Sequence, residues 1–161
     1  MIQICFVCLG NICRSPTAEG IMLDLVRKAG LDEAIAIDSA GTAAWHTGKG
    51  ADPRSQAEAN ERGIQLPSRA RQFKAQDFEK FDYVVAMDHS NFDNLLDLDP
   101  SAPTKTKLCL LREYHPENPG KLDVPDPYYG GPDGFADVFD LCDASCRNLL
   151  RTIVETHGLS A

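Results

Sequence analysis

Residues 2–16 read IQICFVCLGNICRSP, an apolar run that passes through a short loop into a helix start. Residues 2–8 are mostly β-branched, aromatic or otherwise apolar, which is typical of a strand covered on both faces. Ser15 and Pro16 fit the N-cap and the first residue of a helix that runs to about Ala29. A strand, a loop and a helix in this order predict the first half of a β–α–β unit.

The rest of the chain repeats this alternation. Further strands are predicted over 34–38, 83–87 and 107–111, and further helices over 54–62, from Ser90, and along a C-terminal apolar stripe. That stripe consists of Phe135, Val138, Phe139, Cys142, Cys146, Leu149, Leu150 and Ile153. Residues 113–132 are rich in Pro, Gly and Asp and are expected to form a long loop. We therefore predict an α/β fold in three layers, with a four-stranded parallel sheet, helices on both faces and right-handed crossovers.

Length and composition fit one globular domain over residues 1–161, with 43% hydrophobic and 25% charged residues. Because 16 Lys and Arg face 24 Asp and Glu, the formal charge is −8, so no general attraction to nucleic acid or anionic lipid is expected. The apolar N-terminal run lacks the basic flank of a signal peptide, and no segment approaches the length of a membrane span. We expect a cytoplasmic protein with neither a nucleic-acid nor a membrane partner.

The loop after the first predicted strand concentrates the chemistry. It fits neither GxGxxG nor GxxxxGK[ST], but it places Cys8 six positions before Arg14, at the strand end where parallel sheets bind ligands. Backbone N–H groups and the helix dipole favour a tetrahedral anion there, and Arg14 can grip two phosphate oxygens. The same field favours a Cys8 thiolate nucleophile, which a hydrogen bond from Ser15 can stabilise as it departs. The predicted phosphate-binding residues are Leu9, Gly10, Asn11, Ile12, Cys13, Arg14 and Ser15, with Gly10 and Asn11 allowing unusual backbone angles.

The bare spacing of cysteine and arginine is common by chance, but a longer pattern accompanies it. FVCLGNICRSP resembles the signature of the low-molecular-weight protein tyrosine phosphatases, which is Cys, five residues, Arg and Ser. The likeness recurs at Asp38-Ser39-Ala40-Gly41-Thr42, Trp45, Asp52-Pro53-Arg54, Ala70-Arg71-Gln72, Met87-Asp88 and Val124-Pro125-Asp126-Pro127-Tyr128-Tyr129. The resemblance implies hydrolysis of phosphotyrosine and aryl phosphate monoesters through a phosphocysteine, without metal or organic cofactor. It also implies that Cys8 is the nucleophile, Arg14 the phosphate clamp and Asp126 the general acid.

Asp126 fits the role of the acid on chemical grounds as well. A phenolate that leaves phosphorus needs a proton, and water that attacks a phosphocysteine needs a base, so one carboxyl group can serve both steps. Pro125 and Pro127 restrict the backbone on either side. An Asp-Pro pair alone usually marks only a turn, so this role depends on the presence of the Cys8 loop.

Aromatic residues supply candidate walls for a substrate pocket. Tyr128 and Tyr129 follow Asp126 in a Gly-rich segment, where their rings can stack on a flat substrate ring. The resemblance implies that they line the entrance and that Trp45 forms the opposite wall. Local packing explains Trp45 almost equally well.

The phosphate-binding loop also needs support from behind. Asn11 and Ser39 are expected to hold its strained shape by hydrogen bonds. The family often has a histidine just before residues 70–72, whereas this chain reads Pro-Ser-Arg over residues 67–69. How the loop is braced is therefore an open question at the level of sequence.

The six cysteines are expected to be free thiols in a reducing compartment. Cys13 shares the loop with Cys8, and we hypothesise that a sulfenic acid on Cys8 is resolved by Cys13 as a reversible disulfide. Cys5, Cys142 and Cys146 are expected in the core. The four histidines show no metal-binding spacing and are expected at the surface, so no metal site is predicted: His46, His89, His115 and His157.

Two alternatives to a phosphatase remain open. An arsenate reductase of related fold needs further cysteines on a mobile segment, and the spare cysteines here fall in a predicted strand and helix. A catalytically silent phosphate-binding regulatory module would need none of the chemistry that the loop offers. For the phosphatase, the expected partner is a phosphotyrosine protein, such as a bacterial tyrosine kinase, and the expected state is a monomer or weak dimer.

Overall fold

Four parallel strands form the centre of the protein, in a computed structural model that describes residues 1–117, 120–128, 130–131 and 133–160. The strands are β1 (Ile2–Cys8), β2 (Ile35–Gly41), β3 (Tyr83–Ala86) and β4 (Leu108–Leu110). They lie in the order β2-β1-β3-β4, and each neighbouring pair is parallel. The predicted four-stranded parallel sheet is thus confirmed.

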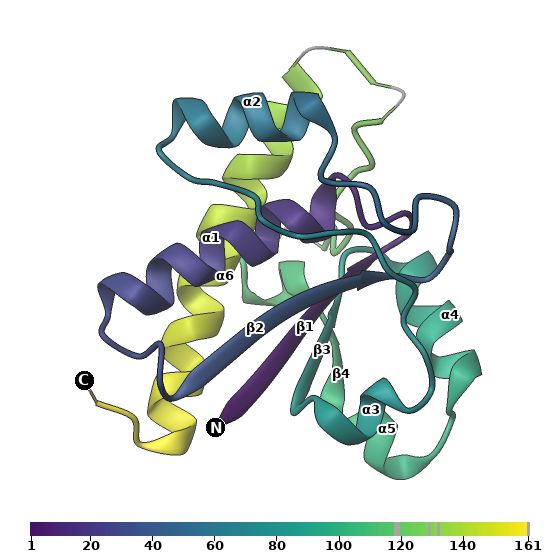
Figure 1. Cartoon of the computed structure of the whole chain (residues 1–161). Coiled ribbons are helices and arrows are strands. Elements are labelled where there is room, and N and C mark those ends of the chain that lie inside the picture. The colour runs from purple at the N-terminus through teal and green to yellow at the C-terminus, as the bar shows by residue number, and fades with distance from the viewer. Residues whose placement is uncertain (118–119, 129, 132, 161) are drawn as a thin grey trace.

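Helices cover both faces of this sheet (Figure 1). One face is covered by α1 (Arg14–Lys28) and α6 (Asp133–His157), with α2 (Pro53–Glu61) packed against α6. On the other side lie α3 (Asp77–Lys80), α4 (His89–Leu98) and α5 (Ala102–Lys107), and the 3₁₀ turn η1 (Leu111–Tyr114) follows β4. The three-layer α/β prediction is therefore correct.

The central strand β1 serves two separate hydrophobic cores because successive side chains of a strand point to opposite faces. Ile4, Phe6 and Cys8 belong to the core beneath α1 and α6. Cys5 and Val7 belong to the core on the side of α3 and α4. Since all five are buried, the strand that leads into the loop is fixed from both sides, and Cys8 ends it on the α1 face.

The predicted helix cap at Ser15 is wrong. Helix α1 begins at Arg14, two residues before the predicted first residue Pro16, with Cys13 in the N-cap position and no side-chain hydrogen bond there. The Ser15 hydroxyl lies instead 3.0 Å from the sulfur of Cys8. The serine side chain thus points back toward the strand end, and the first-turn N–H groups keep no side-chain acceptor.

The C-terminal prediction is confirmed, because every residue of the apolar stripe on α6 is buried. Strand β2 is longer than the predicted 34–38 and reaches Gly41, which pairs in register with Cys8. This extension places the end of β2 beside the start of the loop. Within the described residues, none of the helices combines the length and the apolar character that crossing a bilayer requires.

Candidate active site

The loop after β1 turns at Asn11, whose φ of 58° lies in the left-handed region that asparagine tolerates better than most residues. Its buried side chain ties three segments together. The amide Nδ2 donates to Ser15 Oγ at 2.7 Å and to Ser39 Oγ at 3.0 Å, and Oδ1 accepts from the backbone N–H of Arg71 at 3.1 Å. Asn11 therefore fixes the loop to β2, through Ser39, and to the segment that contains Arg71.

Gly10 does not use the unusual backbone angle expected from sequence. Its small size matters instead, because a Cβ at this position would lie 2.9 Å from Cδ2 of the His46 ring. The imidazole of His46, which was expected at the surface away from any site, packs over the loop at this point and lines the cavity. Its position depends on the loop after β2, which no local pattern around His46 predicts.

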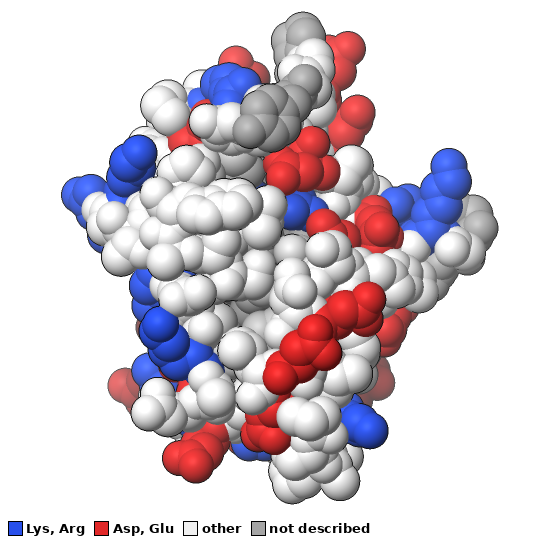
Figure 2. All heavy atoms as spheres, turned by 90° about the vertical axis from the view of Figure 1, so that its right-hand side faces the viewer, with Lys and Arg blue, Asp and Glu red and all other residues white. Residues whose placement is uncertain are grey.

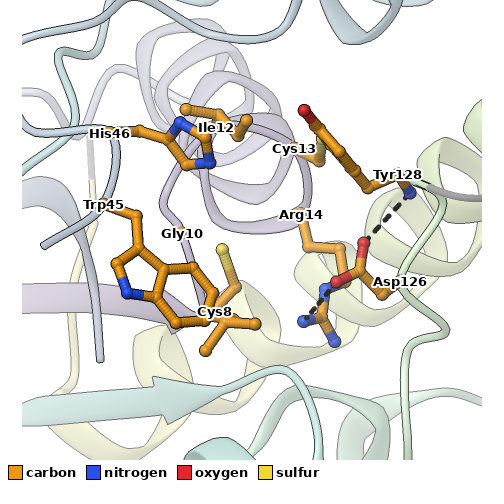
Figure 3. A pocket seen from close by; sticks show the side chains of 10 residues that line it. Cys8, Gly10, Ile12, Cys13, Arg14, Trp45, His46, Asp126 and Tyr128 are labelled. Carbon is orange, nitrogen blue, oxygen red and sulfur yellow. Dashed lines mark hydrogen bonds and ion pairs between the residues drawn. The ribbon is translucent and has the colours of Figure 1, made fainter. Parts of the chain in front are cut away.

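Cys8 ends β1 with its sulfur directed into a cavity (Figure 3). The Sγ atom accepts a hydrogen bond from the backbone N–H of Asn11 at 3.3 Å, and Ser15 Oγ lies 3.0 Å away. Such donors stabilise a thiolate relative to a thiol. The residue is only 3% exposed, so the sulfur is reached through the cavity alone.

Arg14 lies beside this sulfur, at the first position of α1, and is 2% exposed. Its Nη1 donates to Asp88 Oδ2 at 2.6 Å and to the carbonyl oxygen of Val124 at 2.9 Å. Burial opposes the charge of the guanidinium, but Cys8 and Asp88 outweigh it and raise the pKa of Arg14. A fixed, fully charged guanidinium thus faces the cavity.

Asp88 is a supporting residue to which sequence reasoning assigned no role. It follows β3 and is the N-cap of α4, where Oδ1 accepts the N–H of Asn91 at 2.7 Å while Oδ2 pairs with Arg14. An Asp at the carboxyl end of a buried strand, just before a helix, was the available signal.

Asp126 approaches from the long segment between η1 and α6. Its Oδ2 lies 3.6 Å from Nη2 of Arg14, and its Oδ1 accepts the backbone N–H of Tyr128 at 3.0 Å (Figure 3). The carboxyl side chain is 42% exposed, so it stands at the mouth of the cavity and not in its floor.

The cavity has a volume of about 240 Å³. Its walls come from the loop after β1, the loop after β2 and the segment that carries Asp126. Its lining residues are Cys8, Leu9, Gly10, Ile12, Cys13, Arg14, Trp45, His46, Asp126 and Tyr128. Trp45 and Tyr128 stand on opposite sides of it (Figure 3), and Trp45 is 71% exposed. The predicted wall residue Tyr129 lies outside the described residues.

A buried chain of hydrogen bonds continues behind the loop. Ser39, which receives a hydrogen bond from Asn11, donates its own hydroxyl to Glu19 Oε1. Glu19 is 6% exposed, and burial raises the pKa of its carboxyl to about 7, against the effect of the Ser39 hydrogen bond. Ser68 Oγ is buried and has no hydrogen-bond partner among the described residues. The sequence left open how the loop after β1 is supported. The support consists of hydrogen bonds that run from Asn11 through Ser39 to Glu19 on α1.

The cysteines outside the nucleophile position are buried or half-buried thiols. Cys13 is 5% exposed, and burial, together with the charge of Asp52, raises its pKa to about 12. All six cysteines of the chain are described, and each is a free thiol. Cys5, Cys142 and Cys146 lie in the two cores as expected. In the part of the chain that the structure describes, no three His, Cys, Asp or Glu side chains gather into a group able to hold a metal ion.

The surface around the site is not uniformly charged. On the face shown in Figure 2, acidic side chains gather right of centre and at the lower left, and basic ones lie along the left edge, at the top and at the right edge. The chain carries a net charge of −8. Distant surface charges are screened by salt, so the buried guanidinium of Arg14 is the positive charge that acts most directly on an anion in the cavity.

Comparison with known proteins decides the family. Residues 3–158 match the sequence profile described as low molecular weight phosphotyrosine protein phosphatase. The chain belongs to this family. The phosphatase is 46% identical to the low molecular weight protein-tyrosine-phosphatase of Streptomyces coelicolor, over 95% of this chain and 94% of the relative.

Solved structures of related enzymes agree with this fold. The protein tyrosine phosphatase of Entamoeba histolytica with Hepes in its active site matches the phosphatase with a TM-score of 0.92 and 39% identity, over 98% of this chain and 99% of that one. A Drosophila arginine phosphatase matches with a TM-score of 0.87 and 35% identity, over 94% and 98% of the two chains. The resemblance read from the sequence, the fold and the enzyme class are all confirmed.

Proposed function

We propose that this phosphatase hydrolyses phosphotyrosine in proteins, and related aryl phosphate monoesters, through a phosphocysteine intermediate on Cys8. One observation carries the proposal: Cys8 and Arg14, from the loop after β1, and Asp126, from the segment before α6, meet at a single cavity. A dianionic phosphate fits the charged guanidinium and the N–H groups of the loop. Aromatic walls at Trp45 and Tyr128 suit a flat phenyl ring.

In the first step, the Cys8 thiolate attacks phosphorus and forms an S–P bond while the P–O bond to the phenol breaks. The proton of the Asp126 carboxyl passes to the departing phenol oxygen. Arg14 and the loop N–H groups of residues 9–15 hold the equatorial oxygens, where charge gathers in the transition state.

In the second step, the Asp126 carboxylate accepts a proton from water as the water oxygen bonds to phosphorus. The P–S bond breaks, inorganic phosphate is released, and the sulfur leaves as a thiolate. The Ser15 hydroxyl, 3.0 Å from that sulfur, is placed to donate a hydrogen bond to it. The two steps balance without a metal or an organic cofactor.

Turnover of p-nitrophenyl phosphate and phenyl phosphate by single variants tests this assignment. Cys8→Ser should lose nearly all turnover of both esters, because a hydroxyl at this position is a far weaker nucleophile. Asp126→Ala should lose on the order of 100-fold or more in kcat/KM for phenyl phosphate, but much less for the better leaving group. Equal losses on the two esters would argue against an acid role for Asp126.

The remaining alternatives are separated by substrate. An arsenate reductase would reduce arsenate with a thiol donor, and a silent binding module would turn over no ester. Because one similar structure is an arginine phosphatase, a phosphoarginine peptide belongs beside the phosphotyrosine peptide in the same panel. A kcat/KM for the phosphoarginine peptide that exceeded the phosphotyrosine value would overturn the proposed substrate.

We further propose that the enzyme works in the cytoplasm, as a monomer or weak dimer, on phosphotyrosine proteins such as a bacterial tyrosine kinase. The free state of all six cysteines supports a reducing compartment. A Cys8→Ser variant, which binds but does not turn over substrate, should retain phosphotyrosine proteins from a lysate of the source cell. Sedimentation of the purified enzyme over a range of concentrations measures its oligomeric state.

A further inference from the structure

Arg54, in the first turn of α2, reaches from the phosphate-binding loop toward the segment that carries Asp126. Its Nε and Nη2 each lie 3.0 Å from a carboxylate oxygen of Asp52, in a two-pronged ion pair. Its Nη1 donates to the carbonyl oxygen of Tyr128 at 3.2 Å. The guanidinium also stacks 5.2 Å from the ring centre of Tyr128 and 4.7 Å from that of Phe135.

The Asp52 end of this contact is buried and hydrogen-bonded on two sides. Asp52 donates its backbone N–H to the carbonyl oxygen of Ile12, in the phosphate-binding loop, at 2.7 Å. Its carboxylate is 7% exposed and also caps α2 through the N–H of Arg54 at 2.8 Å. Arg54 is therefore anchored to the same loop that is proposed to hold the phosphate.

The Tyr128 end has little regular structure. The described residues from 115 to 131 form no helix or strand, so few backbone ladders restrain them. Arg54 holds the carbonyl of Tyr128, and the N–H of Tyr128 holds Asp126 Oδ1 at 3.0 Å. The Arg54 guanidinium also stacks on Phe135, in the first turn of α6, where this segment ends. A single side chain thus links the phosphate-binding loop to two points of the segment that follows the proposed acid.

We propose that Arg54 is a positioning residue for the general acid. It holds the Asp126 segment in register with the phosphate-binding loop, so that the carboxyl stands over the leaving oxygen. This inference rests on the proposed function. It predicts a defect that grows with the basicity of the leaving group, because misplacing an acid matters most where protonation is most needed.

Arg62 offers a matched control, because it ends the same helix and makes the same kinds of contact. Its guanidinium stacks 4.5 Å from the ring centre of Phe139 on α6 and pairs with Asp140 at 2.7 Å. Arg62→Gln therefore removes a stacked, ion-paired arginine between α2 and α6 without touching the Asp126 segment. Any loss of kcat/KM that Arg54→Gln shows beyond that of Arg62→Gln is therefore due to the contacts of Arg54 with the Asp126 segment.

The experiment compares kcat/KM for phenyl phosphate and 2,4-dinitrophenyl phosphate in the native enzyme, Arg54→Gln, Arg54→Lys and Arg62→Gln. We expect Arg54→Gln to lose about 10-fold on phenyl phosphate and less than about 2-fold on the dinitrophenyl ester, as a partly displaced acid would. Arg54→Lys keeps the charge but not the planar guanidinium, so its kcat/KM for phenyl phosphate should lie between those of the native enzyme and Arg54→Gln. Arg62→Gln should match the native enzyme on both esters.

A second comparison uses Asp126→Ala as background. If Arg54 acts through Asp126, Arg54→Gln should cause no further loss on phenyl phosphate once the carboxyl is gone. Equal losses on the two esters, an effect matched by Arg62→Gln, or full additivity in the Asp126→Ala background would each overturn the inference. Should Arg54→Gln not fold, Arg54→Lys carries the same comparisons.

Failure of the proposed function looks different. In that case the native enzyme would hydrolyse neither ester, or Cys8→Ser would retain turnover. The inference on Arg54 alone fails when the native enzyme is active, Asp126→Ala shows its leaving-group dependence, and Arg54→Gln behaves like Arg62→Gln.

Discussion

Cys13 lies in the phosphate-binding loop but lacks the properties of a nucleophile. Burial raises the pKa of Cys13 to about 12, so it is a neutral thiol at ordinary pH, whereas the sulfur of Cys8, the proposed nucleophile, accepts a hydrogen bond from the backbone N–H of Asn11. Peroxide oxidises a thiolate first, giving a Cys8 sulfenic acid. Condensation with the Cys13 thiol would then form a disulfide and release water.

The expected result of Cys13→Ser is that less activity returns on thiol treatment after peroxide, each variant being scored against its own starting activity. The reason is that a sulfenic acid without a resolving partner is oxidised further to irreversible acids. Cys109→Ser, in β4 and away from the loop, is the control and should recover like the native enzyme. Equal recovery in all three proteins would remove Cys13 from this role.

At this scale the sequence predicted which residues meet at the cavity, Cys8, Arg14 and Asp126, but not all the side chains that support them. Cys8 and Arg14 share one local motif, so their proximity follows from the loop itself. The contact between Arg14 and Asp88 spans 74 residues, and the one between Ser39 and Glu19 joins β2 to α1. Such pairs depend on how separate elements pack, which no window of sequence contains.

At the scale of elements, the end of β2 and the phosphate-binding loop approach very closely at Gly41. A Cβ there would lie 2.7 Å from the carbonyl oxygen of Leu9 and 3.2 Å from Cβ of Asn11. Because the nearest atom is backbone, a side chain cannot be accommodated by a rotamer change. The loop conformation therefore depends on a glycine in a neighbouring strand.

Gly41→Ala should lower the free energy of unfolding by about 1–3 kcal/mol and reduce kcat/KM by displacing the loop. Gly50→Ala is a suitable comparison, since its Cβ would meet only ordinary contacts of 3.8 Å or more and should leave both quantities near native. Denaturant unfolding followed by the p-nitrophenyl phosphate assay measures the two effects. If Gly41→Ala matched Gly50→Ala in the free energy of unfolding and in kcat/KM, the close approach of Gly41 to the loop would contribute to neither quantity.

The long elements and the short buried strands β3 and β4 were predictable, but the short helices were not. The apolar stripe of α6 repeats over many turns, so its periodicity outweighs chance. Helices α3 and α5 and the turn η1 have four to six residues each, too few for a periodic signal. The strand predicted over 107–111 is shorter in the structure, where β4 covers Leu108–Leu110. Lys107, the first residue of the predicted strand, is instead the last residue of α5.

At the scale of the whole molecule, Glu19 couples stability to pH. Its pKa rises from 4.5 to about 7 in the folded protein because of burial, with Ser39 as a partly compensating hydrogen-bond donor. Between these two values the folded state binds more protons than the unfolded chain, so stability falls as pH rises through this window. Above about pH 7 the native protein carries the full cost of a buried carboxylate.

Glu19→Gln should therefore gain stability relative to the native protein as pH rises, by up to roughly 3 kcal/mol between pH 5 and 8. A glutamine amide keeps an oxygen to accept from Ser39 but carries no charge. Urea unfolding of both proteins across this range gives the difference, and Glu61→Gln, exposed on α2, should run parallel to native. Parallel curves for Glu19→Gln as well would show that the buried carboxyl does not titrate in this window.

The guanidinium of Arg14 donates to the carbonyl of Val124, across 110 positions of the chain. A ribosome must therefore have made most of the polypeptide before this clamp can close. Refolding from urea should restore the circular dichroism of the early strands and helices before it restores ester hydrolysis, because distant partners meet last. Enzymatic turnover is consequently a reporter of the completed topology and not merely of its N-terminal half.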